Sequence, residues 1–239
     1  MAVHSAAAHV VVIPCWNEAA TIGPIVERVR VHVPDVIVVD DGSTDATGSI
    51  ALDAGAVVER HRNNLGKGAA LRTGLARASA AGFAWALTLD GDGQHLPEDI
   101  PAFVERAART GAALVVGDRT AGAAGMPWIR RTANWWMSRQ LSRQADFSLP
   151  DSQCGFRLLR LDAWRQLRIE CDHFEIESET ILTFARAGFR IEFVPVPVIR
   201  SARPSRIRAF ADTVRWLRWW REASQPASAP VGHGLPRTV

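Results

Sequence analysis

The chain has 239 residues, of which 47% are hydrophobic and 22% are charged, and its formal net charge is +3. This composition is typical of a globular protein with a sizeable core, and no apolar run reaches the roughly 18 residues of a transmembrane helix. The three cysteines lack metal-ligand spacing and the N-terminus lacks a basic segment followed by an apolar one, so we expect reduced thiols, no signal peptide and a cytoplasmic location.

Short apolar runs alternate with helical patterns through the first half of the chain. The runs that predict buried strands are 10–14, 36–39, 56–59, 84–89 and 112–116. The segments with helical spacing are 17–30, 45–54, 65–81 and 97–109. Strands that alternate with helices in this way predict a Rossmann-like α/β fold, with a mostly parallel sheet and helices on both faces.

The second half is less regular. Helices are predicted over 129–143, 178–187 and 207–222, with a loop over 151–157 and a strand over 189–198. Pro195 and Pro197 place that strand at a sheet edge, because proline cannot donate a ladder hydrogen bond. The expected organisation is a flexible N-terminus over 1–8, one domain over 9–206, a basic and aromatic helix over 207–223, and a disordered tail over 224–239.

Polar residues follow the apolar runs where the predicted strands end: Glu18, Asp40-Asp41, Asp90-Gly91-Asp92 and Arg119. Ligands of parallel sheets bind beyond the carboxyl ends of the strands, so these residues predict one site. Asp90 and Asp92 would repel each other unless a cation lay between them, and Gln94 offers a third oxygen on the same turn. Such oxygen ligands suit Mg²⁺ or Mn²⁺ shared with substrate phosphates, whereas the alternative is a solvated Asp-Gly turn.

Five motifs occur in an order that resembles family 2 glycosyltransferases. They are Val12-Ile13-Pro14-Cys15-Trp16-Asn17-Glu18, Val39-Asp40-Asp41-Gly42-Ser43-Thr44-Asp45, Leu65-Gly66-Lys67-Gly68-Ala69-Ala70, Asp90-Gly91-Asp92-Gly93-Gln94-His95 and Asp151-Ser152-Gln153-Cys154-Gly155-Phe156-Arg157. The set is similar to the dolichyl-phosphate mannose and glucose synthases and their bacterial polyprenyl-phosphate relatives, over about residues 9 to 207. This resemblance implies a GT-A fold, a donor of the GDP-mannose or UDP-glucose type, Mg²⁺ or Mn²⁺, and inverting transfer of a hexose to a polyprenyl phosphate.

The resemblance also implies roles for individual residues. The nucleotide would be held by Pro14, Trp16 and Glu18, and the nucleoside would be lined by Val39 and Asp41. The metal and diphosphate would be held by Asp90, Gly91, Asp92 and Gln94. The donor would also meet Arg119, Arg200 and Arg206. The chain departs from its relatives at Trp16, where they have tyrosine, and at Arg206, where they often have lysine.

The chemistry does not require a strong general base. A polyprenyl phosphate has a second pKa of about 6, so it is largely dianionic near neutral pH and can attack the anomeric carbon unaided. Asp151, Glu177 and Glu179 are candidates for acceptor positioning or proton handling, and the alternative is that they are ordinary loop and helix carboxylates.

Other residues have simpler interpretations. We expect His95 only to end the turn, and His173 to lie on the surface or in a loop. Lys67 could meet phosphate at a helix start, although its spacing is not that of a P-loop. Trp135 and Trp136 suggest packing or an interface, because no nucleic-acid motif accompanies them.

The last predicted helix has an apolar stripe ringed by arginines. The stripe consists of Ile207, Phe210, Val214 and Leu217, broadened by Trp216, Trp219 and Trp220. Such a helix suits a bilayer interface, a membrane protein partner, or packing on the protein's own core. Two alternatives to a lipid acceptor also stay open: a soluble acceptor, and a membrane-surface binding protein with a degenerate donor site.

Overall fold

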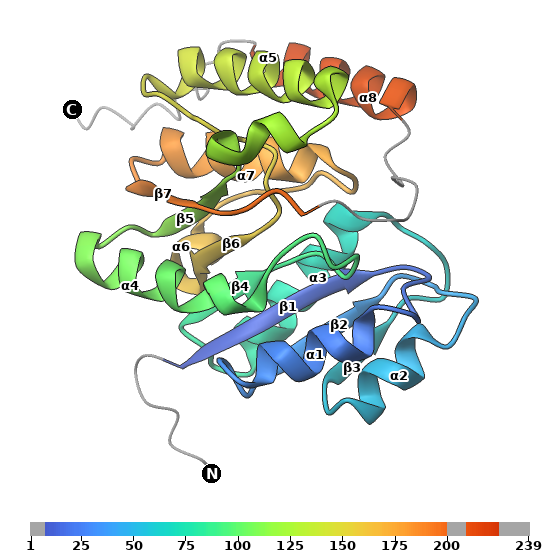
Figure 1. Ribbon diagram of the computed structural model, residues 1–239. Coiled ribbons are helices and arrows are strands. Elements are labelled where there is room, and N and C mark those ends of the chain that lie inside the picture. Colours follow the sequence, from blue (N-terminus) through green and yellow to red (C-terminus); the bar gives the residue numbers. More distant parts are fainter. Residues whose placement is uncertain (1–7, 200–208, 225–239) are drawn as a thin grey trace, which may run out of the picture.

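The computed structural model describes residues 8–199 and 209–224, which form one mixed sheet with helices on both faces (Figure 1). In the described residues the sheet has seven strands in the order β3-β2-β1-β4-β6-β5-β7. Their bounds are β1 His9–Cys15, β2 Val36–Asp40, β3 Val57–Arg60, β4 Trp85–Thr88, β5 Leu114–Asp118, β6 Arg157–Arg160 and β7 Ile191–Pro195. The predicted α/β class and mostly parallel sheet are confirmed.

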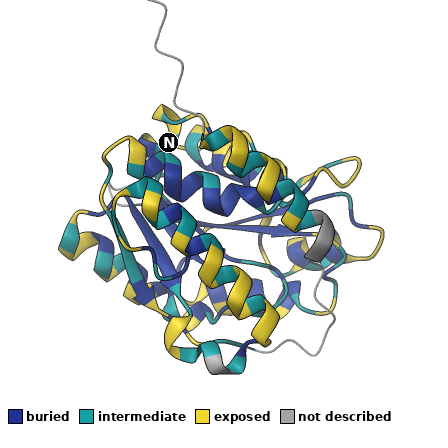
Figure 2. Cartoon of the chain, turned by 90° about the horizontal axis from the view of Figure 1, so that it is seen from above, coloured by how far each residue is buried: buried dark blue, intermediate teal, exposed yellow. Residues whose placement is uncertain are grey.

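The helices fill the connections between the strands. Their bounds are α1 Ile22–Arg30, α2 Thr47–Asp53, α3 Lys67–Ala80, α4 Ile100–Thr110, α5 Trp128–Ala145, α6 Leu161–Gln166, α7 Glu175–Arg186 and α8 Ala209–Ala223, with short 3₁₀ segments η1 Pro97–Asp99 and η2 Thr120–Gly125. Figure 2 shows burial concentrated on the strands and on the inner sides of the helices. The predicted helices and apolar runs of the first half are therefore confirmed in kind, with shifted ends.

The largest departure from expectation is β6, which lies between β4 and β5 and runs antiparallel to both. The sequence predicted only a loop there, and neither β6 nor α6. Arg157 is the reason that the sequence pattern does not indicate a strand, because a charged residue is not expected in a buried strand. Its guanidinium is buried and donates to the carbonyls of Ser152, Cys154 and Glu177. Since β6 runs backwards, the loop before it lies at the carboxyl ends of β4 and β5.

The helix predicted from residue 17 begins only at Ile22. Asn17 has a φ of +54°, a left-handed conformation that interrupts a helix, and the segment up to Thr21 forms turns instead. β7 pairs only with β5 and ends at Pro195, which confirms its predicted edge position in the described sheet.

The described part of α8 packs on the protein itself. Trp216 is buried, and its indole Nε1 donates to Ser178 Oγ of α7 at 2.8 Å. Its ring lies 5.3 Å from that of Trp136 of α5 and is stacked on that of Trp220. Leu217 is instead 40% exposed, so the face that packs inward is centred on Trp216, which the sequence placed only in the broadened part of the predicted stripe.

Several of the predicted features lie on residues that the structure does not describe. Arg200, Arg206, Ile207, the first seven residues and residues 225–239 lie outside the described residues. Within 8–199 and 209–224, no helix has the length and apolar character needed to cross a membrane.

Candidate functional site

The turn after β4 carries Asp90, Asp92 and Gln94 on one short segment. Asp92 accepts the backbone N–H of Gln94 at 3.0 Å and its amide Nε2 at 2.7 Å. The turn is tied to the start of α1, because Thr21 Oγ1 donates to Gly91 O at 2.7 Å. A Cβ on Gly91 would lie only 3.1 Å from Cys15 Cβ, so a larger residue here would push Cys15 away by a few tenths of an ångström.

Lys67 joins this turn to α7. Its Nζ lies 2.6 Å from Asp90 Oδ1 and 2.7 Å from Glu177 Oε1, inside a largely buried space. Gly155 leaves room for the pair, since a Cβ there would lie 2.8 Å from the ammonium. His95 is also drawn in, with Nε2 3.5 Å from Asp90 Oδ2, so it does more than end the turn.

The two aspartates have opposite electrostatic surroundings. Burial favours the neutral form of Asp90, but Lys67 and His95 outweigh it and hold the pKa of that carboxyl well below its usual range. Burial and then the negative charge of Asp90 raise the pKa of Asp92. In the described residues Asp92 forms no ion pair, so a cation beside it would relieve the repulsion from Asp90.

Arg119, at the end of β5, is fixed by a buried carboxylate. Its Nε and Nη2 donate to the two oxygens of Asp151 at 2.7 and 3.0 Å. Asp151 also accepts from Asn134 Nδ2 at 3.1 Å and from the N–H of Gln153 at 3.0 Å. Burial raises the pKa of Asp151, but Arg119 outweighs this effect and lowers it, so Asp151 stays ionised and engaged. This geometry suits positioning of Arg119 better than proton handling.

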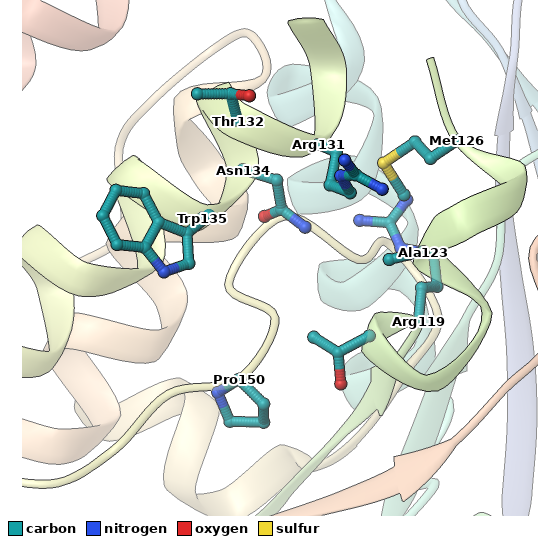
Figure 3. Close-up of a pocket in the computed structure, with 9 residues that line it drawn as sticks. Arg119, Ala123, Met126, Arg131, Thr132, Asn134, Trp135 and Pro150 are labelled. Atoms are coloured by element: carbon teal, nitrogen blue, oxygen red, sulfur yellow. The ribbon is translucent and has the colours of Figure 1, made fainter. Parts of the chain in front are cut away.

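A pocket of about 340 Å³ opens beside Arg119 (Figure 3). Its lining is Arg119, Thr120, Ala123, Met126, Arg131, Thr132, Asn134, Trp135 and Pro150. Figure 3 shows Arg119 and Arg131 extending into one part of the pocket, with Trp135 on another side. The pocket therefore combines cationic groups with apolar walls.

Arg130 borders the same region and was missed in the sequence. Burial and repulsion from Arg119 lower its pKa, while Asp92 and Asp90 oppose this effect, so its charge lies within the field of both aspartates. Asn134 was missed as well. One sequence signal could have indicated Arg130 and the neighbouring Asn134. Two arginines stand at the start of α5, after a Gly- and Ala-rich segment that follows β5.

The end of β1 and the segment that follows it, which contain Pro14, Trp16 and Glu18, lie beside the Asp90 turn. A Cβ on Gly91 would be 3.5 Å from Pro14 O and 3.7 Å from Glu18 Cγ. Glu18 is buried and its N–H donates to Thr47 Oγ1, whereas Trp16 is 39% exposed and offers an accessible ring.

Asp41 and Val39, both predicted to contact the nucleoside, make their contacts with other residues of the protein. Asp41 accepts from the N–H groups of Leu65 and Gly66 at 2.9 and 2.8 Å, and lies 2.6 Å from His61 Nδ1. It thereby ties the loop before α3 to the end of β2. Val39 is fully buried, packs toward Gly74 of α3 and accepts from Cys15 Sγ through its carbonyl, so it presents no exposed surface to a nucleoside.

The two predicted carboxylates of α7, Glu177 and Glu179, have different functions. Glu177 faces Lys67 and belongs to the site. Glu179 accepts the N–H groups of Glu170 and Cys171 at 3.1 and 2.8 Å, so it holds the chain that precedes α7. The sequence suggested that Lys67 could meet phosphate at a helix start, and the structure places its ammonium against two carboxylates. Lys67 is also the only lysine of the sequence, against 27 arginines.

The model of the family described as glycosyl transferase family 2 matches residues 10–168. The chain belongs to glycosyltransferase family 2. This glycosyltransferase is 32% identical over 238 residues to the undecaprenyl-phosphate mannosyltransferase of Micrococcus luteus, with 87% of this chain and 94% of the relative covered. It is 31% identical over 211 residues to the polyprenol monophosphomannose synthase of Mycolicibacterium smegmatis, with 78% and 75% covered.

Among solved structures, the glycosyltransferase is similar to glucosyl-3-phosphoglycerate synthase of Mycobacterium tuberculosis in complex with Mn²⁺, UDP and glucosyl-3-phosphoglycerate. The TM-score is 0.73 at 23% identity, and 93% of this chain and 82% of that chain are covered. This likeness confirms the expected GT-A type of fold.

Proposed function

We propose that this glycosyltransferase moves a hexose from a nucleoside diphosphate sugar to a polyprenyl phosphate, with inversion and with a divalent metal. The observation that carries the proposal is Arg119, which a buried carboxylate fixes at a pocket with apolar walls. A guanidinium fixed in this way suits a phosphate, and the walls suit the isoprenoid chain attached to it.

The relatives support this acceptor class. The Micrococcus luteus relative is named an undecaprenyl-phosphate mannosyltransferase, and the Mycolicibacterium smegmatis relative is named a polyprenol monophosphomannose synthase. Met126, Trp135 and Pro150 supply the apolar contacts that a phosphoglycerate acceptor would not use. We therefore rank a lipid phosphate above a soluble acceptor.

On the donor side, we propose that Asp90, Asp92 and Gln94 hold Mg²⁺ or Mn²⁺ against the diphosphate. The raised pKa of Asp92 beside Asp90 fits a cation-binding position. In 8–199 and 209–224 no three His, Cys, Asp or Glu side chains meet to hold a metal by themselves, so phosphate oxygens would complete the ligand set. The ion would neutralise the charge that develops on the leaving group.

We propose that the other donor contacts come from Pro14, Trp16, Glu18 and Asp41, with Arg200 and Arg206 near the diphosphate. Arg119, which the resemblance assigned to the donor, is proposed to meet the acceptor phosphate instead. Trp16 offers a stacking surface for the base. The catalytic domain would span 9–206.

The proposed transfer is a single displacement. An oxygen of the acceptor phosphate bonds to the anomeric carbon as its bond to the nucleoside diphosphate breaks, and the nucleoside diphosphate leaves with the electron pair. The acceptor is already a dianion, so no proton has to be removed. This agrees with Asp151, whose oxygens are occupied by Arg119, Asn134 and Gln153. Asp151 then serves as a positioning residue.

A paired assay tests the proposal. Labelled GDP-mannose and UDP-glucose are incubated with the protein, Mn²⁺, and either undecaprenyl phosphate in detergent or 3-phosphoglycerate. We expect label to enter the organic phase with one donor, and Arg119→Met to lose most of this transfer while Arg109→Met on α4 does not. Label that enters only a water-soluble phosphoglycerate product would overturn the lipid acceptor.

A further inference from the structure

The outer face of α5 exposes large aromatic side chains. Trp128 is 70% exposed and Trp135 is 59% exposed. Together with Thr132 and Arg139 they recur every three or four residues, so they share one side of the helix. We call these four residues the α5 outer face. The guanidinium of Arg139 lies 5.6 Å from the centre of the Trp135 ring, so the charge and the ring form one cation–π unit.

The charge of α5 has one sign. Its 18 residues include no Asp or Glu, and its arginines are Arg130, Arg131, Arg139 and Arg143. On the adjoining α8, Arg218 and Arg221 are exposed along with the acidic Glu222, whereas Asp212 is paired with Arg215. The surface formed by α5 and α8 is therefore net positive and attracts anionic partners.

The exposed tryptophans of the α5 outer face are not needed to hold the two helices together. That contact comes from Trp136, which packs edge-on against Trp216, and from Gln144, whose amide donates to Ser224 Oγ. Figure 1 shows α5 and α8 side by side at the end of the molecule opposite α1 and α2. The α5 outer face is thus free for an external contact.

The α5 outer face also borders the pocket. Thr132 and Trp135 belong both to this face and to the pocket lining that contains Arg119. A molecule bound to the face would cover or adjoin the pocket entrance. Tryptophan and arginine together are the residues that favour the headgroup layer of a bilayer, where an aromatic ring meets the acyl boundary and a cation meets lipid phosphate.

We propose that the α5 outer face docks on an anionic lipid bilayer, so that the pocket opens at the level of the headgroups. The docking gives the lipid phosphate a direct path to Arg119, and this part rests on the proposed function. A second copy of the chain fits the face poorly, because a two-fold contact would place the arginines of α5 against one another. The aromatic contact thus shifts from α8, where the sequence predicted it, to α5.

Vesicle sedimentation tests the docking without donor or acceptor. The full chain is mixed with vesicles of phosphatidylglycerol and phosphatidylcholine, or of phosphatidylcholine alone. We expect it to sediment with the anionic vesicles at low salt and to be released by high salt. One test variant combines Trp128→Ser with Ile129→Ser at the exposed neighbouring residue, and it should weaken binding at least tenfold. A second variant combines Arg139→Gln with Arg143→Gln, one turn further along α5, and it should weaken binding by about fivefold for each arginine.

Matched controls lie on distant helices. Val31→Ser with Leu52→Ser removes two exposed apolar groups near α1 and α2, and Arg62→Gln with Arg109→Gln removes two exposed charges. Both controls should sediment as the parent protein does, and all variants should show its melting temperature. The proposal would be overturned if the test and control variants sedimented equally, or if the parent protein stayed in the supernatant. Binding to a DNA duplex is measured in parallel, and an equal loss of that binding in the test variants would also overturn the proposal. Transfer to acceptor in detergent is measured separately, so a failure of docking is distinguishable from a failure of the proposed function.

Discussion

Arg119 donates to both carboxylate oxygens of Asp151, which is fully buried and comes 32 residues later in the chain. This two-point contact fixes the plane of the guanidinium as well as its position. It also makes Arg119 dependent on β6, because the antiparallel course of that strand brings Asp151 to the ends of β4 and β5.

Asp151→Asn should lower the free energy of unfolding by about 3 kcal/mol near neutral pH, because it leaves a buried guanidinium without its counter-charge. The native pKa of Asp151 is below its ordinary value, so its ionisation stabilises the native state above the unfolded-state pKa, and this stabilisation is lost as the pH falls through the native pKa. Urea unfolding at several pH values should show the difference between parent and variant shrinking below pH 3.8. A difference that is constant with pH would contradict the ion pair.

Lys67 should not be replaceable by arginine, although every other basic position outside histidine is an arginine. The space between Asp90, Glu177 and Gly155 fits a compact ammonium. Lys67→Arg and Lys67→Met should each reduce transfer at least tenfold and raise the metal concentration needed for half-maximal rate. The reverse exchange at an exposed position, Arg62→Lys, is the control and should be neutral. Full activity of Lys67→Arg at the parent's metal concentration would refute this account of the ammonium.

The turn after β4 predicts metal dependence. Asp92→Asn should reduce transfer on the order of a hundredfold, because it removes one of the two carboxylates that we propose hold the metal. EDTA should abolish parent activity, and added Mn²⁺ or Mg²⁺ should restore it. Asp99→Asn, on the segment that follows the turn, is the matched control and should retain activity. Undiminished turnover of Asp92→Asn in chelator would rule out the metal.

The contact between α8 and α7 predicts a stability difference between adjacent residues. Trp216→Phe should lower the free energy of unfolding by about 2 kcal/mol, because it removes a buried indole and its hydrogen bond to Ser178. Leu217→Ala, on the exposed side, should change it by less than about 0.5 kcal/mol. Thermal or urea unfolding of the two variants measures this directly. A larger loss for Leu217→Ala would mean that the opposite face of α8 packs inward.

The predictable part of the fold is the part with continuous apolar runs. β1, β2 and β4 are short stretches of buried aliphatic residues, and their carboxyl ends carry the acidic motifs. β6 has arginine at both ends and only two leucines between them, so its pattern does not distinguish a strand from a loop.

The same distinction applies to the site. Asp90, Asp92 and Gln94 are neighbours in sequence, so their convergence could be predicted from local spacing alone. The pairs Lys67–Glu177 and Arg119–Asp151 join distant segments, and only the topology around β6 brings them together. Val39 shows the converse limit, because its position in a motif did not reveal that its side chain faces α3.

The proposed transfer to a lipid phosphate is most directly tested by ³¹P NMR of the purified protein in a Mg²⁺ buffer without Mn²⁺, with the preferred sugar nucleotide and a short polyprenyl phosphate. We expect the phosphate monoester signal to be replaced by a phosphodiester signal while an equal amount of nucleoside diphosphate appears. We also expect the anomeric proton of the new linkage, read by ¹H NMR of the product, to report the configuration opposite to that of the donor. Release of nucleoside diphosphate with the monoester signal unchanged, or a product that retains the donor's configuration, would contradict the proposed transfer.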